Sequence, residues 1–587
     1  MLNVTRKVQG SGVNYVDPVY SKYKMLARRI KRGSSTFGAS DQANFNYCNI
    51  LHDNDGNIYI VTGAGSSVTT PATHGVTVTK YNKFNHDFGN FEWSKFFGNM
   101  GSDLFIRDAA VSNFGHVAIV GERTDFDDAF VMVVNTSGTL EIYDEWTPNT
   151  GTRDMYATSC WWWSDGAQTS ADDLSLAVVC HNNWYGYGGN PWSSPILLRY
   201  GFGNSTNYIA ARNNSNMNVA TNGYYKIMGN NQVNWSPLAR PFRDQPIPDA
   251  AANGDNGFFQ MFCEYGANST EQRYTYSLTS HFHYGSNYAR SGKSYANIEK
   301  PGDSSYKIYQ TSSVRGRALL QDFRPAYQGT TYYNYSFYNL MTVTSGNTYD
   351  YGSFMLVKQS SFGTLSWVKT WTGYGSSTYF GNTENSAVLD FARTMNIVIP
   401  HQDRKSSGTY AYPSDNEGIY VSYRSAINTV TVLQFDRDGD VLQSADFTIN
   451  SSYAIRGHSL GTDGKGNVFV NLKSGVSTSN SMGTWRHIKV PPFNYWNIPS
   501  SQTLSVDSGT TDDDVTISQG TMPTIQDQTA NVSNKTVTSF SAGNPGANYI
   551  GYRLENTSQG CSSAGDLCIS NTNTTASPHR TSQEVSD

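Results

Sequence analysis

The stretch DNDGNIYIVTG, which runs from Asp53 to Gly63, decides the fold assignment. Its first half combines Asp, Gly and Asn. Asp and Asn side chains cap their own backbone in turns, and Gly takes the positive φ that many turns require. Its second half is rich in Ile, Val and Tyr, which favour pleated strands. The stretch therefore predicts a tight turn that opens a β-strand.

The same order of parts recurs along the chain. After the first strand, VTVTKYNKFNHDFGNFEWSKFFG places a second turn at Gly89 and a Trp at position 93. The next copy has turns at Gly115 and Gly138 and ends at Trp146. Later copies contain a turn at Gly363 followed by Trp367, a turn at Gly439 and a turn at Gly466. The irregular spacing excludes a solenoid and favours a β-propeller, whose blades tolerate long loops.

Composition supports an all-β class and restricts the partners. Charged residues form only 15% of the 587-residue chain, which is rich in Gly, Ser, Thr and Asn and has 39 Tyr. The net charge of -5 is too small to indicate a nucleic-acid partner. The sequence contains no uninterrupted apolar run of 18 residues and no apolar segment behind its first basic residues. We expect a leaderless, soluble chain without membrane insertion.

Composition shifts divide the chain into four predicted parts. Residues 1–44 contain the basic segment KYKMLARRIKRGSS and are expected to form an N-terminal arm, either a docking segment or a flexible leader. Residues 45–490 are expected to form the propeller, with six to eight blades. After the prolines at 491, 492 and 499, residues 500–556 predict a small C-terminal β module, and 557–587 a polar tail.

The repeat resembles a known one. The unit D-x-x-G-N-[IV]-Y-[IV]-x-G followed by [FV]-x-x-K-Y-N-x-x-G-x-x-x-W is similar to the β-propeller repeat of many bacterial surface proteins. It also resembles virion structural proteins of marine phages, especially cyanophages. Residues 45–146 and 350–475 carry the likeness. The resemblance implies a tail fibre, baseplate-associated or head-appended virion protein that forms a homo-oligomer at the particle surface. Its partners would be other virion proteins and a host-surface glycan or protein.

Calcium is an alternative interpretation of the Asp-rich turns. In DRDGD, the carboxylates of Asp436, Asp438 and Asp440 have the alternating spacing of calcium ligands. Neither this stretch nor the one at Asp53 continues to the bidentate Glu of an EF-hand loop, because a strand follows at once. Turns in which Asp caps its own backbone are therefore favoured, and no other cofactor is predicted.

The candidate binding residues are aromatic. In SCWWWSDG, strand alternation separates the middle Trp from its neighbours, which suits inter-blade packing or stacking on sugar rings. The insertions NWYGYGGNPWSS and YYNYSFY supply further rings, and loops of this kind recognise glycans or proteins. The candidates are Trp161, Trp162, Trp163, Trp184, Tyr185, Tyr187, Trp192, Tyr332, Tyr333 and Tyr335.

Catalytic and metal motifs are not apparent in the sequence. It contains no nucleophile elbow, HExxH pair or phosphate-binding loop, so we predict a non-enzyme without assigned catalytic residues. The cysteines are far apart except for Cys561 and Cys568, which a disulfide could join, and Cys180 has the setting of a small buried hydrophobe. A sialidase-like or polysaccharide-degrading propeller and a bacterial surface adhesin remain as alternatives to the virion protein.

Overall fold

The computed structural model describes residues 23–29, 48–203, 206–307, 312–373, 396–398, 419–449, 455–490 and 498–584, several of these ranges with internal gaps. The described chain consists of β-strands and the turns between some of them, which confirms the predicted all-β class. Within these residues no helix has the length and apolar character to cross a membrane.

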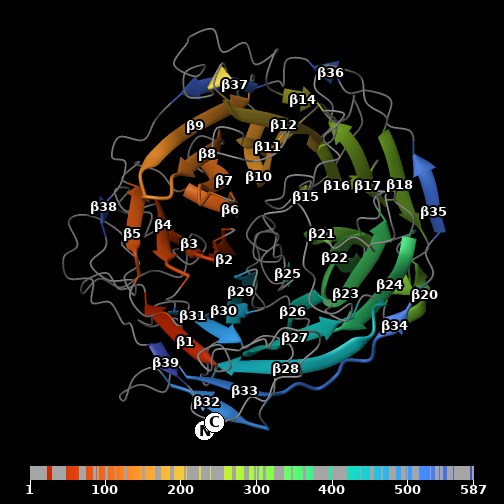
Figure 1. Ribbon diagram of the computed structural model, residues 1–587. Coiled ribbons are helices and arrows are strands. Elements are labelled where there is room, and N and C mark those ends of the chain that lie inside the picture. Colours follow the sequence, from red (N-terminus) through yellow and green to blue (C-terminus); the bar gives the residue numbers. More distant parts are fainter. Residues whose placement is uncertain are drawn as a thin grey trace, which may run out of the picture.

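Seven antiparallel sheets form a propeller-like ring (Figure 1). Each sheet contains a unit of four strands, here called a blade, whose first strand lies nearest the centre of the ring and whose fourth lies at its outside. Blades are numbered along the chain. Because consecutive strands of a blade pair with each other, blades 1 to 6 are local antiparallel meanders.

The strands of blades 1 to 3 have the following bounds. Blade 1 contains β2 (Cys48–His52), β3 (Ile58–Ala64), β4 (Gly75–Tyr81) and β5 (Trp93–Gly98). Blade 2 contains β6 (Leu104–Val111), β7 (Val117–Arg123), β8 (Asp128–Val134) and β9 (Leu140–Pro148). Blade 3 contains β10 (Arg153–Ser164), β11 (Leu174–Tyr185), β12 (Pro191–Gly203) and β14 (Tyr224–Lys226), with β13 (Thr206–Asn207) paired to β12.

Blades 4 to 7 complete the ring. Blade 4 contains β15 (Leu238–Ala239), β16 (Gly257–Gly266), β17 (Arg273–Phe282) and β18 (Arg290–Ala296). A separate pair, β19 (Glu299–Lys300) and β20 (Asp303–Lys307), follows. Blade 5 contains β21 (Ser312–Asp322), β22 (Ser336–Ser345), β23 (Thr348–Ser360) and β24 (Leu365–Thr372). Blade 6 contains β25 (Asn396–Val398), β26 (Ile419–Ala426), β27 (Thr429–Phe435) and β28 (Val441–Ile449). Blade 7 contains β29 (Ile455–Thr462), β30 (Val468–Ser474), β31 (Thr484–Val490) and β1 (Lys24–Arg29).

The hydrophobic cores lie between neighbouring blades. One cluster joins blades 1 and 2 through residues such as Val78 and Ile119, and another joins blades 2 and 3 through Val131 and Leu176. A strand in the middle of a blade therefore buries both faces. β8 does so along its whole length, which explains why its sequence, DAFVMVV, is a nearly continuous apolar run rather than an alternating one.

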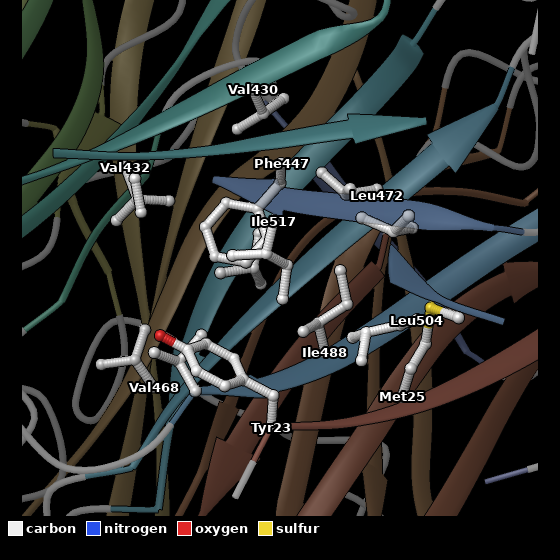
Figure 2. Packing of buried hydrophobic residues seen from close by; sticks show 14 of the residues in the cluster. Tyr23, Met25, Val430, Val432, Phe447, Val468, Leu472, Ile488, Leu504 and Ile517 are labelled. Carbon is white, nitrogen blue, oxygen red and sulfur yellow. The ribbon is translucent and has the colours of Figure 1, made fainter. Parts of the chain in front are cut away.

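The two ends of the chain meet in blade 7. β1 pairs with β31 in antiparallel register from Lys24 opposite Lys489 to Arg29 opposite Thr484, so the N-terminal segment supplies the fourth strand of the last blade. Met25 is fully buried against Ile488 in the core between blades 6 and 7 (Figure 2). This pairing closes the ring.

The C-terminal segment runs around the outside of the ring, against the order of the blades (Figure 1). Its strands are β32 (Gln502–Leu504), β33 (Val515–Gln519), β34 (Gln526–Asp527), β35 (Asn531–Lys535), β36 (Ser541–Ala542), β37 (Ala547–Gly551), β38 (Gln559–Gly560) and β39 (Ser582–Glu584). We call these eight strands the belt.

The belt adds one outer strand to every blade. β33 pairs with β28 of blade 6, β34 with β24 of blade 5, β35 with β18 of blade 4, β36 with β14 of blade 3, β37 with β9 of blade 2, β38 with β5 of blade 1 and β39 with β1 of blade 7. β32 lies outside β33. Part of each of the seven outer strands is thereby paired within the same chain.

The strand pairing departs from the expected organisation at both ends of the chain. Residues 24–29, expected within an N-terminal arm, form part of blade 7. The strands between 502 and 584, expected as a small module and a polar tail, extend the existing sheets one by one. Both segments act through pairing with strands that are remote in sequence, which a local pattern cannot reveal.

A matched pair of leucines tests how firmly the belt is attached. Leu504 of β32 is fully buried in the core of blades 6 and 7, whereas Leu442 of β28 is 42% exposed. We expect Leu504→Ala to lower the free energy of unfolding by about 2 to 5 kcal/mol. Leu442→Ala should change it by no more than about 0.5 kcal/mol. Urea unfolding of both variants gives the comparison, and equal small losses would show that the belt is not packed into this core.

A buried histidine joins blades 6 and 7. His458 of β29 lies with its Nδ1 atom 3.0 Å from Ser422 Oγ of β26. Burial and the nearby Arg424 guanidinium lower the pKa of His458 to about 3, against an ordinary value of 6.5. The histidine is therefore neutral in the folded protein, and the unfolded chain binds its proton more readily.

This histidine should contribute to acid sensitivity. Because the folded-state pKa is depressed, the unfolded state binds more protons between pH 6.5 and about 3, so stability falls as the pH falls through this window. We expect His458→Gln to show a smaller loss of stability than the wild type between pH 7 and pH 4, measured by urea midpoints. Parallel pH profiles of the two proteins would contradict this account.

Candidate functional site

The Asp53 turn is held by its own side chain. Asp53 Oδ1 accepts the backbone N–H of Asn57 at 2.9 Å, and Oδ2 accepts the Asn57 amide at 2.8 Å and the Tyr59 hydroxyl at 3.1 Å. Gly56 adopts a φ of 85°, which favours glycine. Burial raises the pKa of both Asp53 and Tyr59, and the nearby carboxylate raises that of Tyr59 further. Tyr59 thus stays a hydrogen-bond donor.

The same five-residue turn recurs at four other places within the part of the chain that the structure describes. In each, the first residue donates its backbone N–H to the carbonyl of the fifth and accepts the N–H of the fifth with its side chain. The four turns are Ser112 to His116, Asn135 to Thr139, Asp436 to Asp440 and Asp463 to Asn467. Glycines at 115, 138 and 439 have φ values of 79°, 81° and 88°. Ser and Asn replace Asp in two copies, so the turn needs an acceptor oxygen and not a charge.

The same geometry explains the position of Asp436, one of the three proposed calcium ligands. Asp436 Oδ1 accepts the N–H groups of Asp438 and Asp440, both at 2.9 Å. Asp440 lies 3.8 Å from the ammonium group of Lys369. Among the described residues, no group of three or more His, Cys, Asp or Glu side chains is arranged to hold a metal ion. Asp436 therefore acts as a turn cap.

The turns also connect neighbouring blades. At the junction of blades 1 and 2, the Trp93 indole N–H donates to the Thr136 carbonyl at 3.0 Å. Gly138 lies directly beneath the indole, since a Cβ atom there would be 3.0 Å from Trp93 Cδ2. Lys80 lies 5.8 Å from the Tyr59 ring centroid and 3.1 Å from Glu92. The Trp of blade 1 and the turn glycine of blade 2 thus form a single contact between the two blades.

Blade 5 repeats the arrangement against blade 6. Tyr338, Lys358 and Trp367 are aligned across three strands, as Tyr59, Lys80 and Trp93 are in blade 1. Lys358 lies 5.7 Å from the Tyr338 ring centroid. A Cβ atom on Gly439 would be 3.0 Å from Trp367 Cδ2. The sequence motif quoted for the resemblance is therefore explained by inter-blade packing.

Trp162 also has a packing role. Its side chain is buried in the cluster between blades 2 and 3, and its indole N–H donates to the Ala110 carbonyl at 3.2 Å. This is the inter-blade arrangement that strand alternation allowed. Trp161 and Trp163 occupy the adjacent positions of β10, opposite Ala177 and Ser175.

The remaining aromatic candidates divide by position. Trp184 and Tyr185 end β11, and Trp192 lies near the start of β12. Trp184 and Trp192 are Cα partners, so the backbone places two tryptophans opposite each other where this hairpin ends. Tyr187, Tyr332, Tyr333 and Tyr335 lie outside the described residues. A binding role for these residues stays a prediction.

The structure adds a buried polar cluster that sequence reasoning did not find. His487 Nδ1 lies 2.8 Å from Asn471 Oδ1 and 3.9 Å from Cys48 Sγ. Ser459 Oγ donates to the Cys48 carbonyl. All four residues are buried. The Asn471 amide oxygen and the Cys48 thiol both approach Nδ1 of His487, and all these groups are shielded from solvent. The cluster therefore joins blade 7 to blade 1 and does not present a nucleophile to a ligand. Its members are too far apart in sequence to form a recognisable motif.

Three cysteines whose side chains the structure describes are buried. Cys48, Cys160 and Cys180 are free thiols. Cys180 is fully buried, and burial raises the pKa of its thiol. This agrees with the prediction of a small buried hydrophobe at position 180.

Comparisons with known proteins give only distant structural likenesses. No protein-family model and no curated protein matches the sequence. The crystal structure of the polysaccharide lyase Uly1 aligns with 79% of this chain and 98% of the lyase, at 10% identity and a TM-score of 0.38. A protein of unknown function from Dyadobacter fermentans DSM 18053 aligns with 79% and 97%, at 9% identity and a TM-score of 0.30. Likeness at this level gives no information on activity.

The turn assignment predicts the response of Asp436 to substitution. Asp436→Asn keeps an acceptor oxygen, so we expect stability close to that of the wild type. Asp436→Ala removes the acceptor for two N–H groups and should cost about 1 kcal/mol. Thermal unfolding should be the same in calcium and in a chelator at equal ionic strength. A calcium-dependent rise in the midpoint that Asp436→Asn abolishes would instead establish a metal site.

Proposed function

We propose that this chain is a structural and binding protein of a phage particle, in which a seven-bladed β-propeller with an external belt carries loops that contact the host surface. The observation that carries the proposal is the belt. The belt adds an outer strand from the same chain to each of the seven blades. This pairing is additional to the ring closure made by β1. The small C-terminal β module of the sequence analysis is replaced in this proposal by the belt.

The belt suits a protein that has to persist outside a cell. Unpaired outer strands are sites of aggregation and strand exchange, and the belt pairs them. Resistance to unfolding in such a setting depends on the rate at which the structure opens. A ring closed by β1 and enclosed by the belt has to break two sets of contacts before a blade separates. The repeat resembles that of virion structural proteins, which is consistent with the proposal, and it also resembles that of bacterial surface proteins.

The proposed binding residues are at the end of the β11–β12 hairpin. Strands of 12 and 13 residues in blade 3 are longer than the 7-residue strands β3 and β4 of blade 1. Trp184 and Trp192 are opposite each other where this hairpin ends. Aromatic rings stack on the apolar faces of sugars, so a surface glycan is the proposed ligand class. A host protein is the alternative ligand.

Purified particles test the assignment. Mass spectrometry of particles, with immunogold labelling, should place the protein on the virion surface. Its absence from particles, or labelling of uninfected cells, would overturn the virion assignment and favour the bacterial adhesin.

Substitution of the two tryptophans tests the binding residues. We expect Trp184→Ala with Trp192→Ala to weaken binding to host cells at least tenfold, equivalent to about 1.4 kcal/mol. The matched variant with Phe at both positions keeps two rings and should bind within a few-fold of the wild type. Binding that is unaffected by the Ala variant would remove these residues from the site.

Incubation of the protein with host polysaccharide distinguishes binding from degradation. Host polysaccharide exposed to the protein should release neither reducing ends nor unsaturated sugars. Release of either product would make the polysaccharide-degrading alternative the main function.

A further inference from the structure

The first two strands of the belt form a pair on the outside of blade 6. β32 pairs with β33, and β33 pairs with β28, so both lie beyond the fourth strand of that blade. Leu504, Val515 and Ile517 of the pair are fully buried, whereas Thr503 is exposed and Thr516 is half-buried. This alternation gives the pair one apolar face, which is turned toward the ring. We call β32 and β33 the clasp.

The clasp shares a core with the strand that closes the ring. Met25 and Ala27 of β1 belong to the cluster between blades 6 and 7, and so do the three buried residues of the clasp. Figure 2 shows Met25, Ile488 and Leu504 pointing into the same part of this core. Removal of one side chain from such a core leaves its neighbours facing a cavity. The packing of β1 therefore depends on the clasp, and the packing of the clasp depends on β1.

The other face of β1 packs in a different core. Leu26 is buried in the cluster between blades 7 and 1, with Phe469 and Trp485. Strand alternation directs Leu26 and Met25 to opposite faces of blade 7. The contacts of β1 with blade 1 and its contacts with the clasp can thus be altered separately.

The clasp also has an attachment of its own to blade 6. Its second strand pairs with β28, and the backbone N–H of Gly520, directly after this strand, donates to the Ser444 carbonyl at 2.9 Å. A Cβ atom on Gly520 would collide with Ser444 Oγ and would lie 2.9 Å from Asp446 Oδ1. Only glycine therefore allows this close approach of the two backbones. A larger residue would push the clasp away from blade 6 without removing an atom from the shared core.

From these contacts we propose that the clasp controls the opening of the ring at blade 7. β1 is held by its backbone pairing with β31 and by the core that it shares with the clasp. When the clasp lifts, Leu504, Val515 and Ile517 leave that core and Met25 loses its neighbours, so β1 is loosened. When β1 leaves, the clasp loses Met25 in the same way. Coupling of this kind is reciprocal, so the two segments open together.

The clasp makes closure of the ring depend on both ends of the chain. Lys24–Arg29 is synthesised early, but its partner strand β31 and the clasp are synthesised late. The strand that begins the chain is therefore secured only when residues 484–519 have been made. Blades 1 to 6 are local in sequence and do not wait for this step. The inference does not rest on the virion assignment, because it concerns contacts within one chain.

Hydrogen exchange of full-length variants tests the coupling in both directions. We expect Leu504→Ala to speed exchange of the Lys24–Arg29 amides about tenfold, an effect within the range for residues in contact. Met25→Ala should speed exchange of the Val515–Gln519 amides to a similar extent. The matched control, Leu26→Ala, alters the other face of β1. It should speed exchange of Lys24–Arg29 and leave Val515–Gln519 as in the wild type.

A second variant leaves the shared core intact. Gly520→Ala keeps Met25 and Leu504, so it serves if a core substitution prevents folding, and it should speed exchange of both Lys24–Arg29 and Val515–Gln519. Asp128–Val134 of blade 2 is the reference and should not change in any variant. Unchanged exchange of Lys24–Arg29 in Leu504→Ala and Gly520→Ala would overturn the proposal. Equal acceleration of Asp128–Val134 would also overturn it, because blade 7 would then not open separately from the rest of the ring.

Discussion

Pairing between β1 and β31 is the constraint on which the rest of the structure depends. Blades 1 to 6 are local meanders, but blade 7 takes its fourth strand from a segment more than 450 residues earlier, as the partners Lys24 and Lys489 show. Closing so long a loop is entropically costly, and many side chains have to be buried to offset it. Met25, Leu26 and Ala27 are all buried, two in the core shared with blade 6 and one in the core shared with blade 1. These six residues complete blade 7 and add to the contacts that its other strands make with blades 6 and 1.

The sequence repeat serves the contacts between blades rather than a binding site. Trp93 and Trp367 both lie over a turn glycine of the following blade, where a larger residue would not fit. The five-residue turn supplies that glycine and satisfies its own backbone groups through an Asp, Asn or Ser side chain. The residues shared by blades 1 and 5 hold the scaffold. The Trp184 and Trp192 pair, which we propose as binding residues, lies outside this shared arrangement.

Sequence reasoning succeeded where signals are local. The turn at Asp53, the strand after it and the recurrence of both are sufficient to predict the all-β class and the propeller-like sheets of the described residues. It failed at the chain ends, because Lys24–Arg29 and the short belt strands obtain their structure from partners far away in sequence. In the candidate site, strand alternation in the sequence is compatible with the packing role of Trp162. No sequence pattern predicts that Cys48, Asn471 and His487 lie together, because they are far apart in the chain.

The central claim is that both ends of the chain are integral parts of the ring. Hydrogen exchange of the intact wild-type protein, followed by mass spectrometry, tests it most directly. Amides of Lys24–Arg29 and Val515–Gln519 should be protected to an extent comparable with the interior strand Val468–Ser474, because all three are paired strands in blades 6 and 7. Exchange of the two terminal segments at the rate of an unstructured chain, while the interior strand stays protected, would contradict the account.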